Sequence, residues 1–327
     1  MNHPHPLSQK TVVITGASSG VGRAAALAFA EAGAHVVLAA RRQDALEEVA
    51  TECRTKGIEA EVVVTDVGDP QAMKTLAAQA IERFGGIDVW INNAGVGAVG
   101  EFTDTPIAAH ERVIRTNLLG CINGAYAVLP HFKERQAGVL INTLSVGAWA
   151  PTPYSVAYSA SKFGLRGFSE ALRGELSHHE GIHVCDVFPA FLDTPGIAHA
   201  GNYTGREIKP IRPLSDPRRV AQAMVRLAQQ PRDAITVGAA ASAVKWGHGL
   251  APGLVASLLA RGMQAYLRKA APARKTAGNL FEPSSGQGRI DGHYGGVKAR
   301  DVVVPLAAGL ALLGAGVWAL SQHRRRS

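Results

Sequence analysis

Cysteine is scarce in this chain, with only three residues, Cys53, Cys121 and Cys185, among 327. They are widely separated and odd in number, which argues against a disulfide framework and fits a reducing compartment. The first ten residues contain no apolar run. We therefore expect no signal peptide.

Metal-ligand patterns are lacking too, although the chain contains 12 histidines. His178, His179 and His183 gather around the end of one predicted helix, but no cysteine or carboxylate accompanies them at ligand spacing. Solvated or helix-terminal histidines are the simpler interpretation. The sequence predicts no metal site.

Residues 1–260 have no excess charge of either sign, with 23 basic and 23 acidic side chains. Residues 261–327 contain 11 basic and 3 acidic side chains, so the net charge of +8 arises there. A basic tail can bind nucleic acid or an anionic membrane surface. A neighbouring apolar segment favours the membrane.

That segment runs from Val302 to Leu320, nineteen residues without a charge. As a helix it would span about 28 Å, close to the hydrocarbon core of a bilayer. We predict a transmembrane or membrane-anchoring helix over 302–320 and no nucleic-acid partner; a buried core helix is the alternative. Arginines at 324–326 would cross the membrane against the positive-inside tendency if the preceding domain stays in the cytoplasm. A shallow or re-entrant entry, or pairing with a second segment, therefore stays open.

Apolar strand-like runs alternate with helical stretches along residues 1–247. The runs begin near residues 11, 35, 60, 87, 138, 182 and 234. This alternation predicts an α/β fold with a doubly wound parallel sheet. A hydrophobic content of 46% supports one large core.

A glycine-rich segment, Thr15 to Gly22, follows the first apolar run and leads into an alanine-rich helical stretch. At such a strand-to-helix turn, Gly16 permits a tight turn, Gly20 lets the backbone approach a pyrophosphate, and Gly22 allows close packing of helix on strand. The spacing differs from G-x-G-x-x-G. A glycine-rich turn without a ligand is the alternative for an isolated match.

Tyr158 and Lys162 are four residues apart, and Ser145 precedes Tyr158 by thirteen. Positions i and i+4 share one helix face, so the ammonium group of Lys162 can favour the ionised form of the phenol. A phenol with a free pKa of about 10 then becomes usable as a proton donor and acceptor near neutral pH. Alone, this spacing arises by chance on surface helices. Tyr154, four residues before Tyr158, is predicted to be a wall of the pocket.

Together these segments resemble the short-chain dehydrogenase/reductase family over roughly residues 8–240. The family carries T-G-x-x-x-G-x-G, an Asn-Asn-Ala-Gly segment, a Ser about thirteen residues before the Tyr, and Tyr-x-x-x-Lys. All four occur here in order, with Asn-Asn-Ala-Gly at 92–95. Asn117 matches the family's fourth catalytic position. The resemblance implies a Rossmann-type sheet with helices on both faces, here followed by a C-terminal helical extension.

The resemblance also implies roles for the four catalytic positions. Ser145 would hydrogen-bond the substrate oxygen, and Tyr158 would exchange the proton. Lys162 would assist Tyr158 and bind the ribose, and Asn117 would hold a water in a proton relay. Hydride would pass between nicotinamide and the substrate carbon.

Cofactor choice is predicted at the end of the second strand. An NAD enzyme needs a carboxylate there for the ribose 2'-hydroxyl, whereas an NADP enzyme needs a cation for the 2'-phosphate. Ala40 occupies the carboxylate position, and Arg41 and Arg42 follow. Guanidinium matches phosphate geometry, so we predict NADP(H), with Arg41 as first candidate and Arg42 as second. Solvated arginines at a helix start are the alternative.

Other cofactor-binding positions follow from the family motifs. Asp66, with Val67 beside it, resembles the position that bonds adenine, and Thr194 the position that holds the nicotinamide carboxamide. Where the family usually has Pro-Gly, this chain has Pro189-Ala190; a positive φ at Ala190 would cost about 1 kcal/mol. The predicted cofactor residues are Thr15, Gly16, Ser18, Ser19, Gly20, Val21, Gly22, Arg41, Arg42, Asp66, Val67, Asn93, Ala94, Gly95, Tyr158, Lys162, Pro189 and Thr194.

The domain prediction is a catalytic NADP-binding domain over 1–247, an amphipathic helix over 248–270 and a flexible linker over 271–301. The helix carries an apolar stripe at Leu250, Leu254, Val255, Leu258, Leu259 and Met263, which suits core packing or the lip of a pocket better than a membrane surface. The linker contains several glycines and prolines. Its Leu280, Phe281 and Tyr294 could still dock into grooves.

The sequence therefore predicts an NADP(H)-dependent oxidoreductase acting on a lipophilic alcohol or carbonyl compound. We expect the catalytic domain in the cytoplasm, membrane association through the C-terminus, and a possible homodimer or homotetramer. Three alternatives stay open: a non-catalytic NADP-binding, redox-responsive interaction protein, a nucleic-acid or membrane-surface adaptor, and a 3-ketoacyl reductase. The substrate itself is not predicted.

Overall fold

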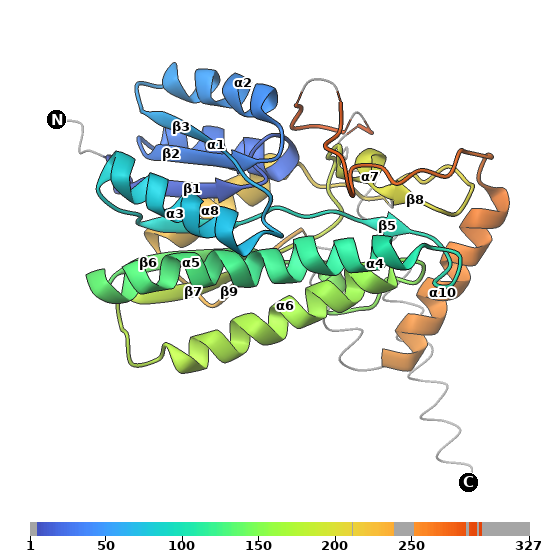
Figure 1. Ribbon diagram of the computed structural model, residues 1–327. Coiled ribbons are helices and arrows are strands. Elements are labelled where there is room, and N and C mark those ends of the chain that lie inside the picture. Colours follow the sequence, from blue (N-terminus) through green and yellow to red (C-terminus); the bar gives the residue numbers. More distant parts are fainter. Residues whose placement is uncertain (1–4, 211, 239–251, 286–287, 293, 296–327) are drawn as a thin grey trace, which may run out of the picture.

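The computed structural model describes residues 5–210, 212–238, 252–285, 288–292 and 294–295. Within these ranges, seven parallel strands form one sheet in the order β3-β2-β1-β4-β6-β7-β9 (Figure 1). The strands are β1 (Thr11–Thr15), β2 (His35–Ala40), β3 (Ala60–Val64), β4 (Val89–Asn92), β6 (Gly138–Thr143), β7 (Ile182–Pro189) and β9 (Ala234–Val237). The predicted α/β fold with a doubly wound parallel sheet is confirmed.

Helices cover both faces of this sheet. The helices α1 (Gly20–Glu31), α2 (Gln43–Arg54) and α8 (Pro217–Gln229) pack on one face. The opposite face is covered by α3 (Pro70–Phe84), α5 (Gly120–Arg135) and α6 (Val156–Glu175). Shorter elements are α4 (Ile107–Ile114), the π-helical turn η1 (Arg115–Leu119), the 3₁₀ turn η2 (Val146–Ala148) and α7 (Gly196–His199).

The strands read as apolar runs because both of their faces are buried. All five residues of β1 are buried, and Val12, Val13 and Ile14 are fully inaccessible. A second, two-residue ladder joins β5 (Ala98–Val99) to β8 (Gly201–Asn202). The sequence did not predict this ladder, because two residues show no periodicity.

The strand order places a crevice at one end of the sheet. β1 pairs with β2 on one side and with β4 on the other, so the strand order reverses between β1 and β4. In sheets of this kind the crevice beyond the carboxyl ends of such strands is where ligands bind. The fold therefore points to the segments that follow β1, β4, β6 and β7.

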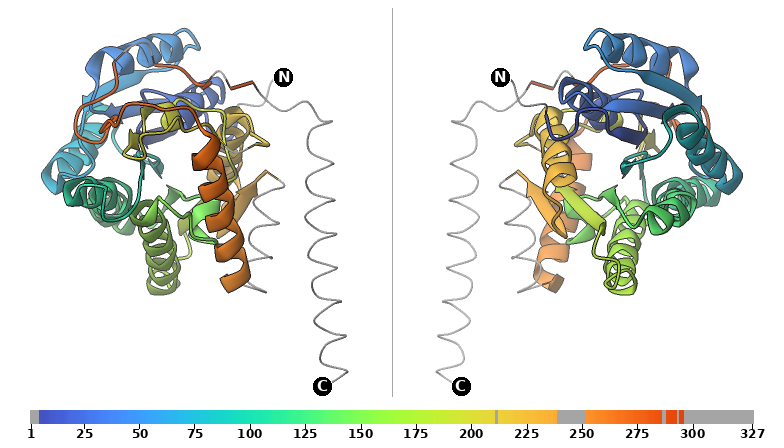
Figure 2. Two further views of the ribbon diagram at one scale, coloured as in Figure 1. Left: turned by 90° about the vertical axis from the view of Figure 1, so that its right-hand side faces the viewer. Right: turned by 90° about the vertical axis from the view of Figure 1, so that its left-hand side faces the viewer.

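A helix beyond the sheet, α10 (Pro252–Lys269), lies on the side of the domain where the strands end (Figures 1 and 2). Among the described residues, no helix has the length and apolarity needed to cross a bilayer. The segment predicted as an anchor, 302–320, lies outside the described residues, as does Leu250 of the predicted stripe.

A buried carboxylate lies near the middle of β7. The side chain of Asp186 is 1% exposed, and its Oδ2 accepts a hydrogen bond of 3.0 Å from Arg173 Nη1. Its Oδ1 is buried without a hydrogen-bond partner in the structure. Burial raises the pKa of Asp186 to about 6.

Replacing Asp186 by asparagine should therefore change how stability depends on pH. Between pH 4.5 and 7.5 the unfolded chain ionises Asp186 more readily than the folded protein does, because the folded pKa is the higher one. Wild-type stability should thus fall with rising pH by about 2 kcal/mol relative to Asp186→Asn. Urea unfolding at the two pH values measures this difference. Parallel pH dependences of the two proteins would contradict it.

Candidate functional site

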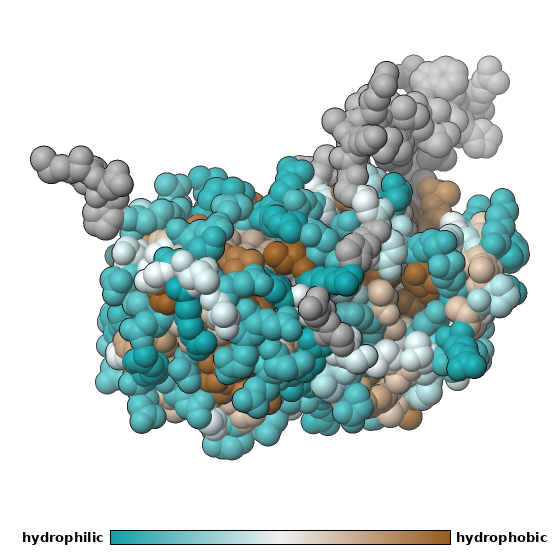
Figure 3. Space-filling model, turned by 90° about the horizontal axis from the view of Figure 1, so that it is seen from above, coloured by the Kyte–Doolittle hydropathy of each residue, from teal (hydrophilic) through white to brown (hydrophobic). Residues whose placement is uncertain are grey.

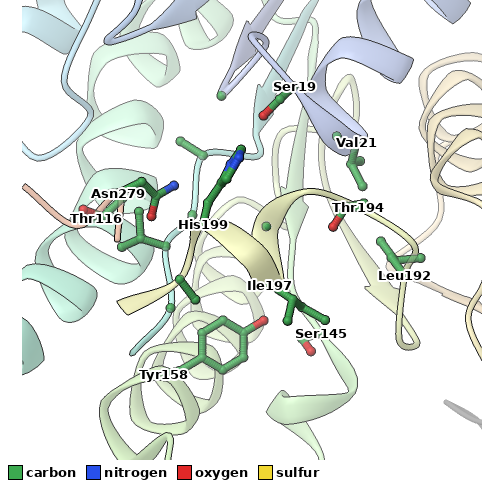
Figure 4. Close-up of a pocket in the computed structure, with 18 of the residues that line it drawn as sticks. Ser19, Val21, Thr116, Ser145, Tyr158, Leu192, Thr194, Ile197, His199 and Asn279 are labelled. Atoms are coloured by element: carbon green, nitrogen blue, oxygen red, sulfur yellow. The ribbon is translucent and has the colours of Figure 1, made fainter. Parts of the chain in front are cut away.

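A cavity of about 600 Å³ lies at the carboxyl ends of the strands. Most of the residues predicted from sequence lie around it: Gly16, Ser18, Ser19, Gly20, Val21, Arg41, Arg42, Asp66, Val67, Asn93, Ala94, Gly95, Ser145, Tyr158, Lys162, Pro189 and Thr194. Thr15, Gly22 and Asn117 do not line it. Figure 4 shows Ser19 and Val21 of the glycine-rich turn together with Ser145, Tyr158 and Thr194 around this cavity.

The glycine-rich turn forms one wall. Gly16 and Gly20 have φ of +68° and +55°, values that favour glycine. A Cβ at Gly22 would overlap the carbonyl oxygen of Gly16, so this position needs glycine for packing. The turn leads directly into α1, whose first N–H groups have no partners within the helix. The N–H of Gly20 donates to the carbonyl oxygen of Arg289 at 2.7 Å. A phosphate group bound at this helix start would take the place of that carbonyl.

Asn93 fixes this turn to the end of β4. Its Nδ2 donates to the carbonyl oxygen of Thr15 at 3.0 Å, and its own N–H donates to Thr15 Oγ1 at 3.0 Å. Thr15 therefore contacts Asn93 and does not itself line the cavity. Its role is to position the turn.

Tyr158 and Lys162 project from the same face of α6 beside the cavity. Lys162 Nζ lies 5.8 Å from the centroid of the Tyr158 ring and donates to the carbonyl oxygen of Thr143 at 2.8 Å. Figure 4 shows the Tyr158 hydroxyl directed toward Ser145 and Ile197. The structure therefore brings Ser145, Tyr158 and Lys162 together at one end of the cavity.

Asn117 is fully buried behind that end, in the π-helical turn η1. Its Oδ1 accepts from the N–H of Val96 at 2.8 Å, and its Nδ2 donates to the carbonyl oxygen of Val96 at 2.9 Å and to Ser161 Oγ at 3.3 Å. These contacts tie α6 to the loop after β4. The part of Asn117 in a proton relay stays a prediction.

Arginines surround the opposite end, where β2 and β3 finish. Arg112 Nη2 donates to Asp66 Oδ2 at 2.6 Å. Although burial opposes the shift, this hydrogen bond lowers the pKa of Asp66. Burial and the neighbouring Arg112 lower the pKa of Arg41. Sequence reasoning missed Arg112, because it belongs to no family motif and lies in a helix far along the chain.

Arg41 and Arg42 differ in how much of their hydrogen-bonding capacity is free. Arg41 donates to the carbonyl oxygens of Asn279, Leu280 and Phe281 at 2.5, 3.1 and 3.0 Å. Arg42 donates through Nη1 to the carbonyl oxygen of Ser284 at 2.7 Å, and its Nε lies 3.0 Å from Asp44 Oδ1. The Nη2 of Arg42 is buried and has no hydrogen-bond partner in the structure. A phosphate could satisfy this nitrogen of Arg42, the second candidate from sequence.

The backbone and cavity geometry test two expectations from the sequence, one about Ala190 and one about Tyr154. Ala190 is not among the described residues with positive φ, so alanine carries no backbone penalty there. Tyr154 has φ of +65° but does not line the cavity, so its prediction as a pocket wall was wrong. Its carbonyl oxygen instead accepts from the N–H of Gly100 at 2.8 Å.

Several lining residues come from outside the predicted catalytic domain. Met263 of α10 lines the cavity, as do Thr276, Asn279, Pro283, Ser284 and Gly288. Of the predicted stripe, Leu258 and Leu259 are exposed. The sequence suggested that this helix either packs on the core or forms the lip of a pocket. Because Met263 lines the cavity, the structure favours the lip. Nothing in the local sequence marks the residues beyond 270 as lining.

Comparisons with known proteins agree with this geometry. The model of the short chain dehydrogenase family matches residues 10–202. The chain is 31% identical over 330 residues to the uncharacterized oxidoreductase YxnA of Bacillus subtilis, covering 98% of this chain and 92% of that protein.

Two solved structures are similar as well. One is an alcohol dehydrogenase from the archaeon Thermococcus sibiricus complexed with 5-hydroxy-NADP, with a TM-score of 0.61, 27% identity, and coverage of 70% of this chain and 95% of that chain. The other is a metagenomic short-chain oxidoreductase in complex with NADP, with a TM-score of 0.61, 30% identity, and coverage of 71% and 98%.

Proposed function

The chain belongs to the short-chain dehydrogenase/reductase family of oxidoreductases, and from that premise we propose that it transfers hydride between NADP(H) and a lipophilic alcohol or carbonyl compound. The proposal rests on which residues lie at each of the two ends of the cavity. Ser145, Tyr158 and Lys162 converge at one end, and the glycine turn and Arg42 line the same cavity toward the other.

The residues present fit a dinucleotide. Gly16, Gly20 and the start of α1 line the cavity and would hold the pyrophosphate in place of the Arg289 carbonyl. Asp66 with Val67 would hold the adenine by family resemblance. By family resemblance, Thr194 would hold the nicotinamide carboxamide and Lys162 the ribose. A guanidinium nitrogen of Arg42 lacks a partner in the structure, which is the kind of group that a phosphate satisfies.

Proton transfer is the part of the chemistry assigned to the chain itself. The bound cofactor supplies or receives the hydride. In the reductive direction, the Tyr158 hydroxyl donates a proton to the carbonyl oxygen of the substrate. Ser145 donates a hydrogen bond to the same oxygen. The ammonium group of Lys162 lies near enough to stabilise the phenolate that is left.

NADP(H) is preferred to NAD(H) in this proposal for three reasons. Ala40 stands where an NAD enzyme would carry a carboxylate. Arg42 offers an unpaired guanidinium nitrogen in the structure. Two similar solved structures were obtained with NADP or 5-hydroxy-NADP bound.

A lipophilic substrate is supported by the apolar part of the cavity lining. Leu192, Ile197 and Met263 line it, and Ile197 lies beside Tyr158 and Ser145 (Figure 4). Figure 3 shows a mainly hydrophilic face in which hydrophobic residues appear in recesses. Membrane attachment through 302–320 would bring such substrates close, but that segment lies outside the described residues. The anchor and a homo-oligomeric assembly stay predictions.

The substrate class can be tested by NADPH oxidation followed at 340 nm. We expect kcat/KM to rise along a series of ketones and aldehydes of increasing apolar surface, because burying each additional methylene group contributes about 0.8 kcal/mol. An acetoacetyl thioester and a short polar ketone are the comparison substrates. Preference for the polar ketone would contradict the lipophilic class, and preference for the thioester would favour a 3-ketoacyl reductase.

A further inference from the structure

The chain beyond α10 returns to the cavity. Residues 271–285, here called the C-terminal strap, leave α10 and run past β8 and α7 toward α2 (Figure 1). Two reciprocal backbone hydrogen bonds of 2.8 Å join Asn202 to Thr276. The strap is therefore held to the ladder that edges the cavity.

A single apolar side chain anchors the middle of the strap. Leu280 is fully buried in a cluster with Val96, Ala98, Ala109, Val113 and Ala157, against which the Tyr158 ring also packs. Two residues before Leu280, Gly278 has φ of +56°, and a Cβ there would overlap the carbonyl oxygen of His199. The N–H of Asn279 donates to that oxygen at 2.8 Å. These contacts fix the orientation of residue 279.

The backbone of the strap also holds the arginines at the end of β2. Carbonyl oxygens of three successive residues, 279–281, accept hydrogen bonds from Arg41, and Leu280 O also accepts from Arg112 Nε at 2.8 Å. Because Arg112 in turn bonds Asp66, the strap lies directly against the groups assigned to the adenosine half of the cofactor. Residue 279 belongs to that half of the cavity.

The side chain of Asn279 has a buried polar atom with nothing to bond. Asn279 lines the cavity, and its buried Oδ1 has no hydrogen-bond partner in the structure. Figure 4 shows the amide among cavity side chains near Thr116 and His199. A buried amide oxygen without a partner costs free energy, and ligand donors commonly satisfy such atoms at binding sites.

We propose that Asn279 is a cofactor-binding residue supplied by the C-terminal strap, whose Oδ1 accepts a hydrogen bond from the adenosine half of NADP(H). This inference rests on the proposed use of NADP(H). An amide oxygen only accepts hydrogen bonds, so its partner is the exocyclic amine of adenine or a ribose hydroxyl. The strap thus completes the adenosine subsite that the first two strands begin.

Calorimetric binding of adenosine 2',5'-bisphosphate tests the assignment, because this fragment lacks nicotinamide and needs no turnover. Asn279→Ala should bind it about fivefold more weakly than wild type, the usual worth of one net hydrogen bond. Asn279→Asp should bind it more weakly still, because its carboxylate repels the phosphates. Gln264→Ala, which removes an exposed amide on α10, is the control and should bind as wild type does. Melting temperatures check that each variant folds.

The outcomes separate the two proposals. If wild type does not bind the bisphosphate, the proposed choice of NADP(H) is wrong. If wild type binds it and both Asn279 variants bind equally well, the strap assignment is overturned. Fluorescence titration with NADPH and its deamino analogue identifies the donor: the adenine amine is the partner if the analogue binds wild type more weakly but binds Asn279→Ala as NADPH does. Equal binding of both dinucleotides by wild type assigns the ribose hydroxyl.

Discussion

Replacing Tyr158 by phenylalanine should lower kcat/KM by about 10²–10⁴-fold, the usual contribution of a positioned proton donor. The variant loses one hydroxyl and keeps the ring, which packs against the cluster around Leu280. Folding and the cofactor cradle should therefore be preserved. The dissociation constant of NADPH, measured by fluorescence, should stay within about twofold of wild type.

Tyr154→Phe is the matched control for this experiment. It removes the same hydroxyl from a tyrosine four residues earlier, one whose side chain does not line the cavity. Turnover by this variant should equal that of wild type. Unchanged turnover by Tyr158→Phe would remove the proposed mechanism and favour the non-catalytic binding protein instead.

Replacing Arg42 by alanine should raise the dissociation constant of NADPH about 10–100-fold. A hydrogen bond to a charged group contributes about 1.5–3 kcal/mol, and each 1.4 kcal/mol is tenfold in affinity. NADH lacks the 2'-phosphate, so its dissociation constant should change by less than about threefold. Fluorescence titration of both dinucleotides gives the ratio directly.

Arg54→Ala is the control for charge, because Arg54 is the last residue of α2, the helix that Arg42 precedes, and does not line the cavity. It should leave both affinities unchanged. An equal loss of NADPH and NADH affinity in Arg42→Ala would show that Arg42 acts on the fold of the strap, whose Ser284 carbonyl it bonds. The cofactor preference would then need another source.

The parallel sheet and 17 of the residues that line the cavity could be predicted from sequence because their signals are local. A strand buried on both faces reads as a continuous apolar run, as in Val12 to Ile14, and the glycine turn has a fixed spacing. The order of preference between Arg41 and Arg42 could not be predicted. It depends on the strap, whose carbonyl oxygens accept three hydrogen bonds from Arg41 and one from Arg42.

The strap shows why the remaining cavity contacts could not be predicted from sequence. Residues 271–301 contain the glycines and prolines expected of a linker, and the sequence left docking of Leu280 and Phe281 open. In the structure Leu280 is fully buried, whereas Phe281 is 46% exposed. Such contacts are made by an irregular segment, whose neighbours no periodic pattern encodes. Asn279 lies 238 residues from Arg41 along the chain.

That separation also bears on synthesis at the ribosome. Translation proceeds from the N-terminus, and domains can begin to fold while the remainder is still being made. The sheet through β9 emerges before residue 279 does, so a nascent chain can hold every strand and the Tyr158 helix yet lack the carbonyl partners of Arg41. Completion of this end of the cavity is thereby tied to late translation, and fragments truncated before the strap lack the three carbonyl acceptors of Arg41.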